Sequence, residues 1–199
     1  MFYSKLIQWF LVSAIFLSMS LLIPLYAAEK PKSVKKQTLS AKYLTAKEAY
    51  DLKQQKGKDL LFVDIRTPSE LVFVGTPKNL DINIPFLTLD YKQWDEKKSS
   101  FKKIPNKHFL SGFHSILQSK NLTKDSSVVL LCRSGKRSAK AANLLTSMGY
   151  SNVYTVVDGF EGDKVKKGDL KGKRGVNGWK NAGLPWTYKL NKDRFQLRQ

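Results

Sequence analysis

The chain contains little cysteine, histidine or acidic charge. Its 199 residues include one cysteine, Cys132, two histidines, and 16 acidic residues against 35 lysines and arginines. A single cysteine excludes an internal disulfide. His108 and His114 are six positions apart, which is not the spacing of two metal ligands on one helix face. No glycine-rich nucleotide motif precedes a helix. We therefore expect no metal site and no cofactor.

The shortage of acidic residues leaves a formal net charge of +19. Such a charge attracts nucleic acids, anionic membranes or small anions. No helix-turn-helix, zinc-finger or RNA-binding motif accompanies the lysines, so we expect no nucleic-acid partner. A solvated basic surface that attracts small anions is the simpler prediction. The lysine-rich stretch 161–177 has two interpretations, a solvated loop or a docking site for an acidic protein partner.

Residues 1–28 have the features of an export signal. Lys5 gives a positive start, an apolar run covers 6–25, and Ala27 and Ala28 are small residues suited to cleavage. The apolar run approaches the length of a spanning helix, so the leader is either a signal peptide or an N-terminal membrane anchor. We expect a periplasmic or secreted protein that contacts a membrane only through an uncleaved leader.

After the leader, the sequence predicts a basic linker at 29–40, one folded domain at 41–190 and a basic tail at 191–199. Capping boxes at Thr45/Glu48 and Thr67/Glu70 predict two helix starts. Apolar runs and helical spacing place the remaining elements. Strands are expected at 60–65, 81–84, 127–131 and 153–157, and further helices around 109–117 and 138–148. Strands that alternate with helices predict an α/β fold, a parallel sheet with helices on both faces.

Cys132 is the candidate catalytic residue. It follows the strand at 127–131 and precedes a helix, so the backbone N–H groups of residues 133–138 should point at one place and favour negative charge there. Arg133, Lys136 and Arg137 add positive charge, which stabilises a thiolate over a thiol. Because polar residues follow Cys132, we expect it to be partly exposed.

The other residues of this loop have predicted roles of their own. Gly135 allows a tight turn. Ser134 and Ser138 can each donate a hydroxyl hydrogen bond, and Ser138 is a candidate cap for the helix.

Five segments in order resemble the rhodanese superfamily of sulfurtransferases. They cover roughly residues 41–188, and each has a counterpart in the family. Along the chain they are Val63-Asp64-Ile65-Arg66 with Thr67–Glu70, Asp81–Pro85, the loop Cys132–Ser138, Asp158-Gly159-Phe160, and Gly178-Trp179 through Pro185. Three segments depart from the family pattern. Val74–Leu80 replaces a usual Gly-His-Ile-Pro-Gly-Ala stretch, and 91–121 and 161–177 are longer than usual.

The resemblance implies a mostly five-stranded parallel sheet and a sulfurtransferase. Cys132 would attack a small anionic sulfur donor such as thiosulfate, become a persulfide, and pass the sulfur to cyanide, a thiol or a partner protein. Arg133, Ser134, Gly135, Lys136, Arg137 and Ser138 would bind the donor. In the family, the position of Arg137 often pairs with the acid at the position of Asp64, so we expect that pair to support the loop. Arg66 is either a second anion contact or a surface residue.

Several alternative functions remain open. The fold is shared with dual-specificity phosphatases, whose loop has five residues between cysteine and arginine, whereas here four residues separate Cys132 from Arg137. The shorter loop favours sulfur chemistry over phosphate, and arsenate reduction has no motif in its favour. A non-enzymatic sulfur carrier or protein-binding module would have the same sequence features.

Overall fold

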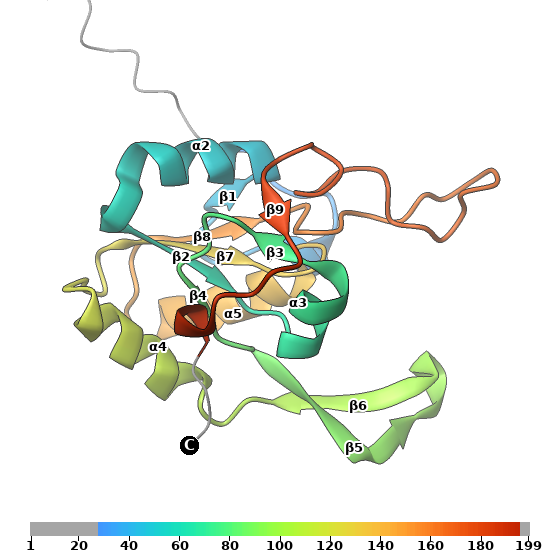
Figure 1. The fold of residues 1–199 in the computed structure, drawn as a ribbon, viewed down its shortest axis with the longest axis horizontal. Coiled ribbons are helices and arrows are strands. Elements are labelled where there is room, and N and C mark those ends of the chain that lie inside the picture. The colour runs from blue at the N-terminus through green and yellow to red at the C-terminus, as the bar shows by residue number, and fades with distance from the viewer. Residues whose placement is uncertain (1–27, 196–199) are drawn as a thin grey trace, which may run out of the picture.

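A five-stranded parallel sheet forms the centre of the computed structural model, which describes residues 28–195 (Figure 1). The strand order is β1-β8-β7-β2-β4, and every pairing in it is parallel. These strands are β1 (Tyr43–Leu44), β2 (Leu60–Asp64), β4 (Ile82–Asn83), β7 (Ser127–Leu131) and β8 (Val153–Val156). The predicted fold class is confirmed. Strand β1, which lies at one edge, has no counterpart among the predicted strands.

Helices cover both faces of this sheet. They are α2 (Ala46–Lys56), α3 (Pro68–Val74), α4 (Phe109–Ser119) and α5 (Lys136–Ser147). One apolar core joins the sheet to α4 and α5, and a second joins its opposite face to α2 and α3. Both predicted capping boxes are present, at Thr45/Glu48 before α2 and at Thr67/Glu70 before α3. The helix predicted around 109–117 is confirmed as α4.

Two small antiparallel sheets lie outside the central one. Strands β3 (Thr76–Pro77) and β9 (Trp186–Thr187) pair with each other. Strands β5 (Leu87–Asp95) and β6 (Ser100–Pro105) form a hairpin that extends from the domain below α3 in the view of Figure 1. This hairpin and α4 make up the long connection before β7. Short 3-10 turns complete the elements at Val34–Lys36, Gly57–Asp59, Glu96–Lys98 and Lys192–Arg194.

Segment 29–40 differs from the expected linker, because it packs on the domain. It contains the 3-10 turn Val34–Lys36, and the Nζ of Lys36 lies 2.8 Å from the Asp163 carboxylate. The backbone N–H of Leu39 donates to Asn143 of α5 at 2.8 Å. The tail also returns to the domain, where Phe195 bridges to Asn83 at the sheet edge.

Residues 1–27 of the expected leader lie outside the described residues, as do 196–199 of the expected tail. Within residues 28–195, none of the helices has the length and apolar character needed to cross a bilayer.

Candidate active site

Cys132 lies at the carboxyl end of β7, where a parallel α/β sheet usually binds its ligand. Residues 132–135 turn the chain into α5, which begins at Lys136. The expectation of partial exposure is wrong, because Cys132 is only 1% exposed. The residue sits inside the turn rather than on its surface. A thiol held in this way is shielded from solvent, so only a small reacting group can approach it directly.

The backbone of this turn is fixed against the segment that follows β8. The carbonyl oxygen of Cys132 accepts from the N–H of Phe160 at 2.8 Å, and that of Arg133 accepts from Glu161 at 3.0 Å. Gly135 has φ +86°, and a Cβ there would lie 2.3 Å from the carbonyl oxygen of Val157. Only glycine fits that left-handed conformation and that close approach. The prediction that Gly135 makes the turn possible is confirmed.

The carbonyl groups of Cys132 and Arg133 accept hydrogen bonds, but the N–H groups that follow Cys132 in the turn find no partner in the described part of the chain. Within residues 28–195, none of the six backbone N–H groups from Arg133 to Ser138 donates a hydrogen bond to the protein. The last three belong to the first turn of α5, whose N-terminus carries partial positive charge. Residues 133–138 therefore form a cradle of unpaired donors next to Cys132, which we call the Cys132 loop. Such a cradle is suited to an anion.

The side chains of the Cys132 loop fall into exposed and buried groups. Arg133 and Lys136 are exposed and form no ion pair with any described residue. Ser134 and Ser138 are buried, and the hydroxyl of Ser138 has no partner in the described part of the chain. Ser138 does not cap the helix as predicted, because α5 starts two residues earlier with Gly135 as its N-cap. The hydroxyl of Ser138 is therefore uncommitted.

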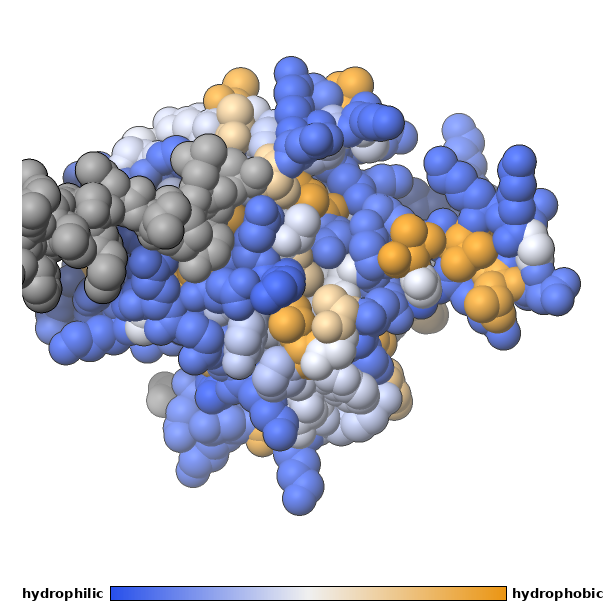
Figure 2. Space-filling view, turned by 90° about the horizontal axis from the view of Figure 1, so that it is seen from above, coloured by the Kyte–Doolittle hydropathy of each residue, from blue (hydrophilic) through white to orange (hydrophobic). Residues whose placement is uncertain are grey.

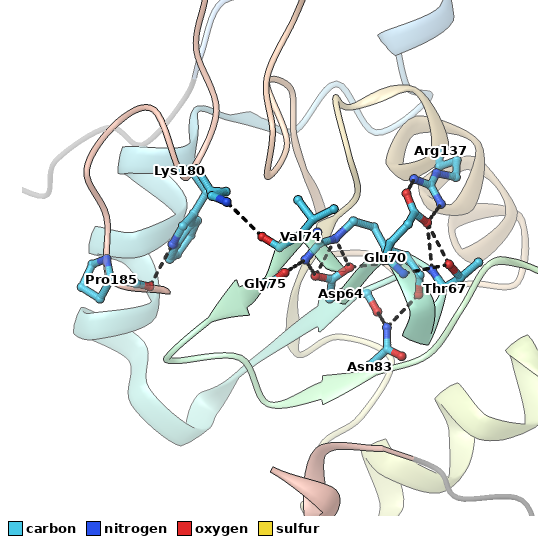
Figure 3. Close-up of polar contacts among 11 residues, drawn as sticks. Asp64, Thr67, Glu70, Val74, Gly75, Asn83, Arg137, Lys180 and Pro185 are labelled. Atoms are coloured by element: carbon cyan, nitrogen blue, oxygen red, sulfur yellow. Dashed lines mark hydrogen bonds and ion pairs between the residues drawn. The ribbon is translucent and has the colours of Figure 1, made fainter. Parts of the chain in front are cut away.

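Arg137 does not pair with Asp64 as expected. It forms a two-pronged ion pair with Glu70 of α3, with Nη1–Oε2 and Nη2–Oε1 distances of 2.7 and 2.5 Å (Figure 3). Glu70 is the third residue of α3, and its position is fixed by the capping box with Thr67. The side chain of Arg137 therefore joins the Cys132 loop to the start of a neighbouring helix. Two parallel N–H···O bonds give this contact a defined geometry.

The pKa values of both side chains differ from those of free glutamate and arginine. Burial alone would raise the pKa of Glu70, but the hydrogen bonds and charge of Arg137 and the N–H of Thr67 lower it to about 2. Burial would lower the pKa of Arg137, but Glu70 outweighs it, with help from Cys132 and Asp64, and raises it. Both side chains therefore stay charged at neutral pH.

Asp64 pairs instead with Arg66, two residues along the chain. Both side chains are fully buried, and the Nη2–Oδ2 distance is 2.6 Å. Arg66 also donates to the carbonyl oxygen of Gly75 at 2.9 Å, and its guanidinium stacks 4.1 Å from the ring centre of Phe160. Neither predicted role of Arg66, anion contact or surface residue, is correct. The pair fixes the backbone at the end of β2, next to the strand that carries Cys132.

Sequence reasoning missed several residues that support the loop. Asn83 donates from Nδ2 to the carbonyl oxygens of Asp64 and Arg66, both at 2.8 Å (Figure 3). Glu70 was assigned only a capping role, because Arg137 was expected to pair with Asp64. Lys103 of β6 is a further cation near the loop. Burial lowers the pKa of Lys103, and so do the positive charges of Arg137 and Arg133. The negative charge of Glu70 acts in the opposite direction and raises it.

The described part of the chain holds no group of three or more His, Cys, Asp or Glu side chains that could bind a metal ion. The groups that the structure places at the site are the Cys132 thiol, the N–H groups of residues 133–138 and the surrounding cations.

Comparison with known proteins decides the family. The model of the rhodanese-like domain matches residues 45–166, more than half of the chain. The chain belongs to the rhodanese family. The "Uncharacterized protein RP600 homolog" of Rickettsia rickettsii is 34% identical over 150 residues, which cover 75% of this chain and all of that protein.

Two further proteins are similar to this rhodanese-like domain. The crystal structure of Rv0390 from M. tuberculosis is similar to this chain, with a TM-score of 0.55 and 27% sequence identity. The match covers 75% of this chain and 98% of that chain. The thiosulfate sulfurtransferase GlpE of Tolumonas auensis is 46% identical over 41 residues, 21% of this chain and 39% of that enzyme. The resemblance inferred from the motifs is confirmed at the level of family and fold.

Proposed function

We propose that this rhodanese-like protein is a sulfurtransferase that uses Cys132 as its nucleophile. The observation that carries the proposal is the set of six unpaired N–H groups from Arg133 to Ser138 beside the chain's only cysteine. A thiosulfate ion and a persulfide anion both need stabilised negative charge, and fixed donors supply it without reorganisation. The local similarity to a thiosulfate sulfurtransferase supports the same chemistry.

The reaction has two half-reactions. In the first, the Cys132 thiolate attacks the outer sulfur of thiosulfate, the S–S bond of thiosulfate breaks, and sulfite leaves with the bonding electron pair. Cys132 then carries a persulfide. In the second, a nucleophilic acceptor such as cyanide or a thiolate attacks the terminal sulfur, and the Cys132 thiolate is the leaving group. No external oxidant or reductant is needed, and the covalent intermediate predicts ping-pong kinetics.

The side chains of the Cys132 loop have different roles in this reaction. Arg133 and Lys136 are exposed cations that attract and orient the donor at the mouth of the loop. Ser134 and the uncommitted hydroxyl of Ser138 are available to donate hydrogen bonds to bound oxygen or sulfur. Arg137 is engaged by Glu70, so its role is to position the loop rather than to bind the donor directly.

The decisive experiment is thiocyanate formation from thiosulfate and cyanide by the purified protein and its Cys132→Ala variant. We expect turnover in the wild type and only the uncatalysed background in the variant. Ser115→Ala, an exposed change on α4, is the matched control and should retain full turnover. Intact mass after thiosulfate treatment should show the gain of one sulfur atom, which Cys132→Ala abolishes. Equal turnover in wild type and Cys132→Ala would refute the mechanism.

A further inference from the structure

A basic groove borders the Cys132 loop. It has a volume of about 960 Å³ and includes Ser134 and Lys136 of the loop itself. Its other walls come from the N-terminal segment at 31–36 and from the lysine-rich segment Glu161–Asn177. A pocket of this size is at the upper end of those that hold drug-sized ligands. Thiosulfate would fill only a small part of the groove, so the groove has room for a larger ligand.

The lysine-rich segment is held next to the catalytic cysteine. The backbone N–H groups of Glu161 and Gly162 donate to the carbonyl oxygen of Arg133 at 3.0 and 3.3 Å. Further along, Lys164 bridges to Arg174, and the segment folds back on itself as a narrow loop that projects from the domain (Figure 1). A ligand held by this segment therefore lies beside the Cys132 loop.

The charge of the groove is strongly one-sided. Its lining contains six cations, Lys32, Lys36, Lys136, Lys164, Lys166 and Arg174, against one acidic residue, Asp163. Asp163 is already paired with Lys36. Arg174 lies near Glu161 and donates to the carbonyl oxygen of Gly162 at 2.5 Å. The other four cations are exposed and form no ion pair with any described residue. Four unpaired positive charges around one concavity favour a ligand with several negative charges.

The remaining lining indicates the kind of polyanion. Pro31, Val157, Val165 and Val176 supply apolar surface between the cations. In the space-filling view, hydrophobic side chains are interspersed with hydrophilic ones on the projecting segment (Figure 2). No aromatic side chain among residues 28–195 lines the groove, so a nucleic acid would find no platform there on which to stack its bases. Alternating aliphatic and cationic surface instead matches a polypeptide that carries carboxylates and aliphatic side chains.

We propose that this groove is the acceptor site for an acidic polypeptide segment that brings a cysteine thiol to the Cys132 persulfide. The inference rests on the proposed function and specifies its second substrate. The acceptor thiolate attacks the terminal sulfur of the persulfide, the bond between the two sulfurs breaks, and Cys132 leaves as thiolate. The acceptor cysteine becomes the new persulfide, and no net oxidation occurs.

The test uses a synthetic peptide with one cysteine followed by glutamates, and the same peptide with glutamine in place of glutamate. With thiosulfate as donor, we expect the protein to use the glutamate peptide with a kcat/KM higher by about tenfold or more, because several ion pairs add. The ratio between the two peptides is the readout, because any change in the donor half-reaction affects both peptides equally.

Charge reversal locates the site. The variant Lys32→Glu/Lys164→Glu/Lys166→Glu should lose the preference for the glutamate peptide. The control Lys58→Glu/Lys97→Glu/Lys107→Glu has the same net charge, changes exposed lysines outside the groove, and should keep the preference. Equal use of both peptides by the wild type overturns the inference. Equal loss in both triple variants also overturns it, because net charge would then explain the preference.

A binding measurement separates this inference from the proposed function. A fluorescent glutamate peptide with serine in place of cysteine should bind, lose affinity as salt rises, and lose it again in the groove variant but not in the control. If this binding is present while thiosulfate–cyanide turnover is absent, the proposed function fails and the acidic-segment site stands. Absence of binding overturns the site. Displacement of the peptide by a single-stranded oligonucleotide at lower concentration than by unlabelled peptide would overturn its assignment to polypeptide.

Discussion

Two arginine–carboxylate pairs support the region of Cys132, and they differ in burial and in what they connect. Asp64 and Arg66 are both fully buried and lie two residues apart at the end of β2. Glu70 and Arg137 are 12–18% exposed at their side chains and join two elements that are 67 residues apart in sequence. The first pair therefore fixes a local turn, whereas the second fixes the Cys132 loop against α3.

The two ion pairs contribute differently to the fold because they differ in burial. A fully buried pair gains little net stability, because desolvation of both charges offsets their attraction, but it imposes one geometry on its surroundings. A partly buried pair between distant elements retains its charges at lower cost and responds to pH through the carboxylate. We therefore expect the Asp64–Arg66 pair to be the more damaging one to break, and the stability contributed by the Glu70–Arg137 pair to depend on pH.

Arg66→Met should have the largest effect on stability. The variant leaves the Asp64 carboxylate buried without its cation and removes the donor to the carbonyl oxygen of Gly75. Loss of one partner from a buried pair costs about 3–5 kcal/mol. Urea unfolding at pH 7 measures the change in the free energy of unfolding.

A double variant sharpens this prediction. In Asp64→Asn/Arg66→Met the uncompensated charge is gone, while the amide oxygen can still accept from the N–H of residue 66. We expect the double variant to be more stable than Arg66→Met alone. Additive losses from the two single changes would contradict the view that the unpaired charge is the main cost.

Glu70→Gln should have the next largest effect, and that effect should depend on pH. The pKa of Glu70 is lowered from its usual 4.5 to about 2, which corresponds to about 3 kcal/mol of stability when the carboxylate is charged. A lowered folded-state pKa contributes stability that is complete above pH 4.5 and is lost as pH falls towards 2. We expect the difference in unfolding free energy between wild type and variant to shrink over that range.

Glutamine is a suitable replacement because it keeps the size of the side chain and one acceptor oxygen for Arg137. Urea unfolding of both proteins at pH 7, 4.5 and 3 provides the measurement. A difference that stays constant from pH 7 to 3 would show that the ion pair does not carry the stability assigned to it. Glu48→Gln, in the equivalent capping box of α2, where no described arginine pairs with the glutamate, is the matched control for loss of the capping contact alone.

The elements around the site could be predicted because their signals are local. The apolar runs that became β2 and β7, the two capping boxes and the stripe of α4 each depend on neighbouring residues alone. The place of Cys132 between a strand and a helix followed from them. The hairpin of β5 and β6 was missed because it is largely exposed on both faces and has no buried alternation to reveal it.

The partners of the charged residues could not be predicted in the same way. Arg137 has carboxylates near it at the end of β2 and in the first turn of α3, and only the tertiary fold, which brings the starts of α3 and α5 together, decides between them. Arg66 was expected at the surface or on an anion because arginine is rarely fully buried. Its burial follows from three separate contacts, with Asp64, Gly75 and Phe160, that no local pattern encodes.

The smallest expected effect comes from an exposed pair of the same charge type. Lys47 and Asp51 lie one helical turn apart on α2 with an Nζ–Oδ2 distance of 3.1 Å and a lysine side chain that is 74% exposed. Exposed pairs at this spacing contribute about 0.3–0.5 kcal/mol, because water screens the charges and both side chains lose freedom. A double-mutant cycle with Lys47→Ala and Asp51→Ala should give a coupling energy of that size, which falls as salt is raised. A coupling energy equal to that of Glu70 and Arg137 would mean that burial does not set the strength of these ion pairs. The distinction drawn between the Asp64–Arg66 and Glu70–Arg137 pairs would then have no basis.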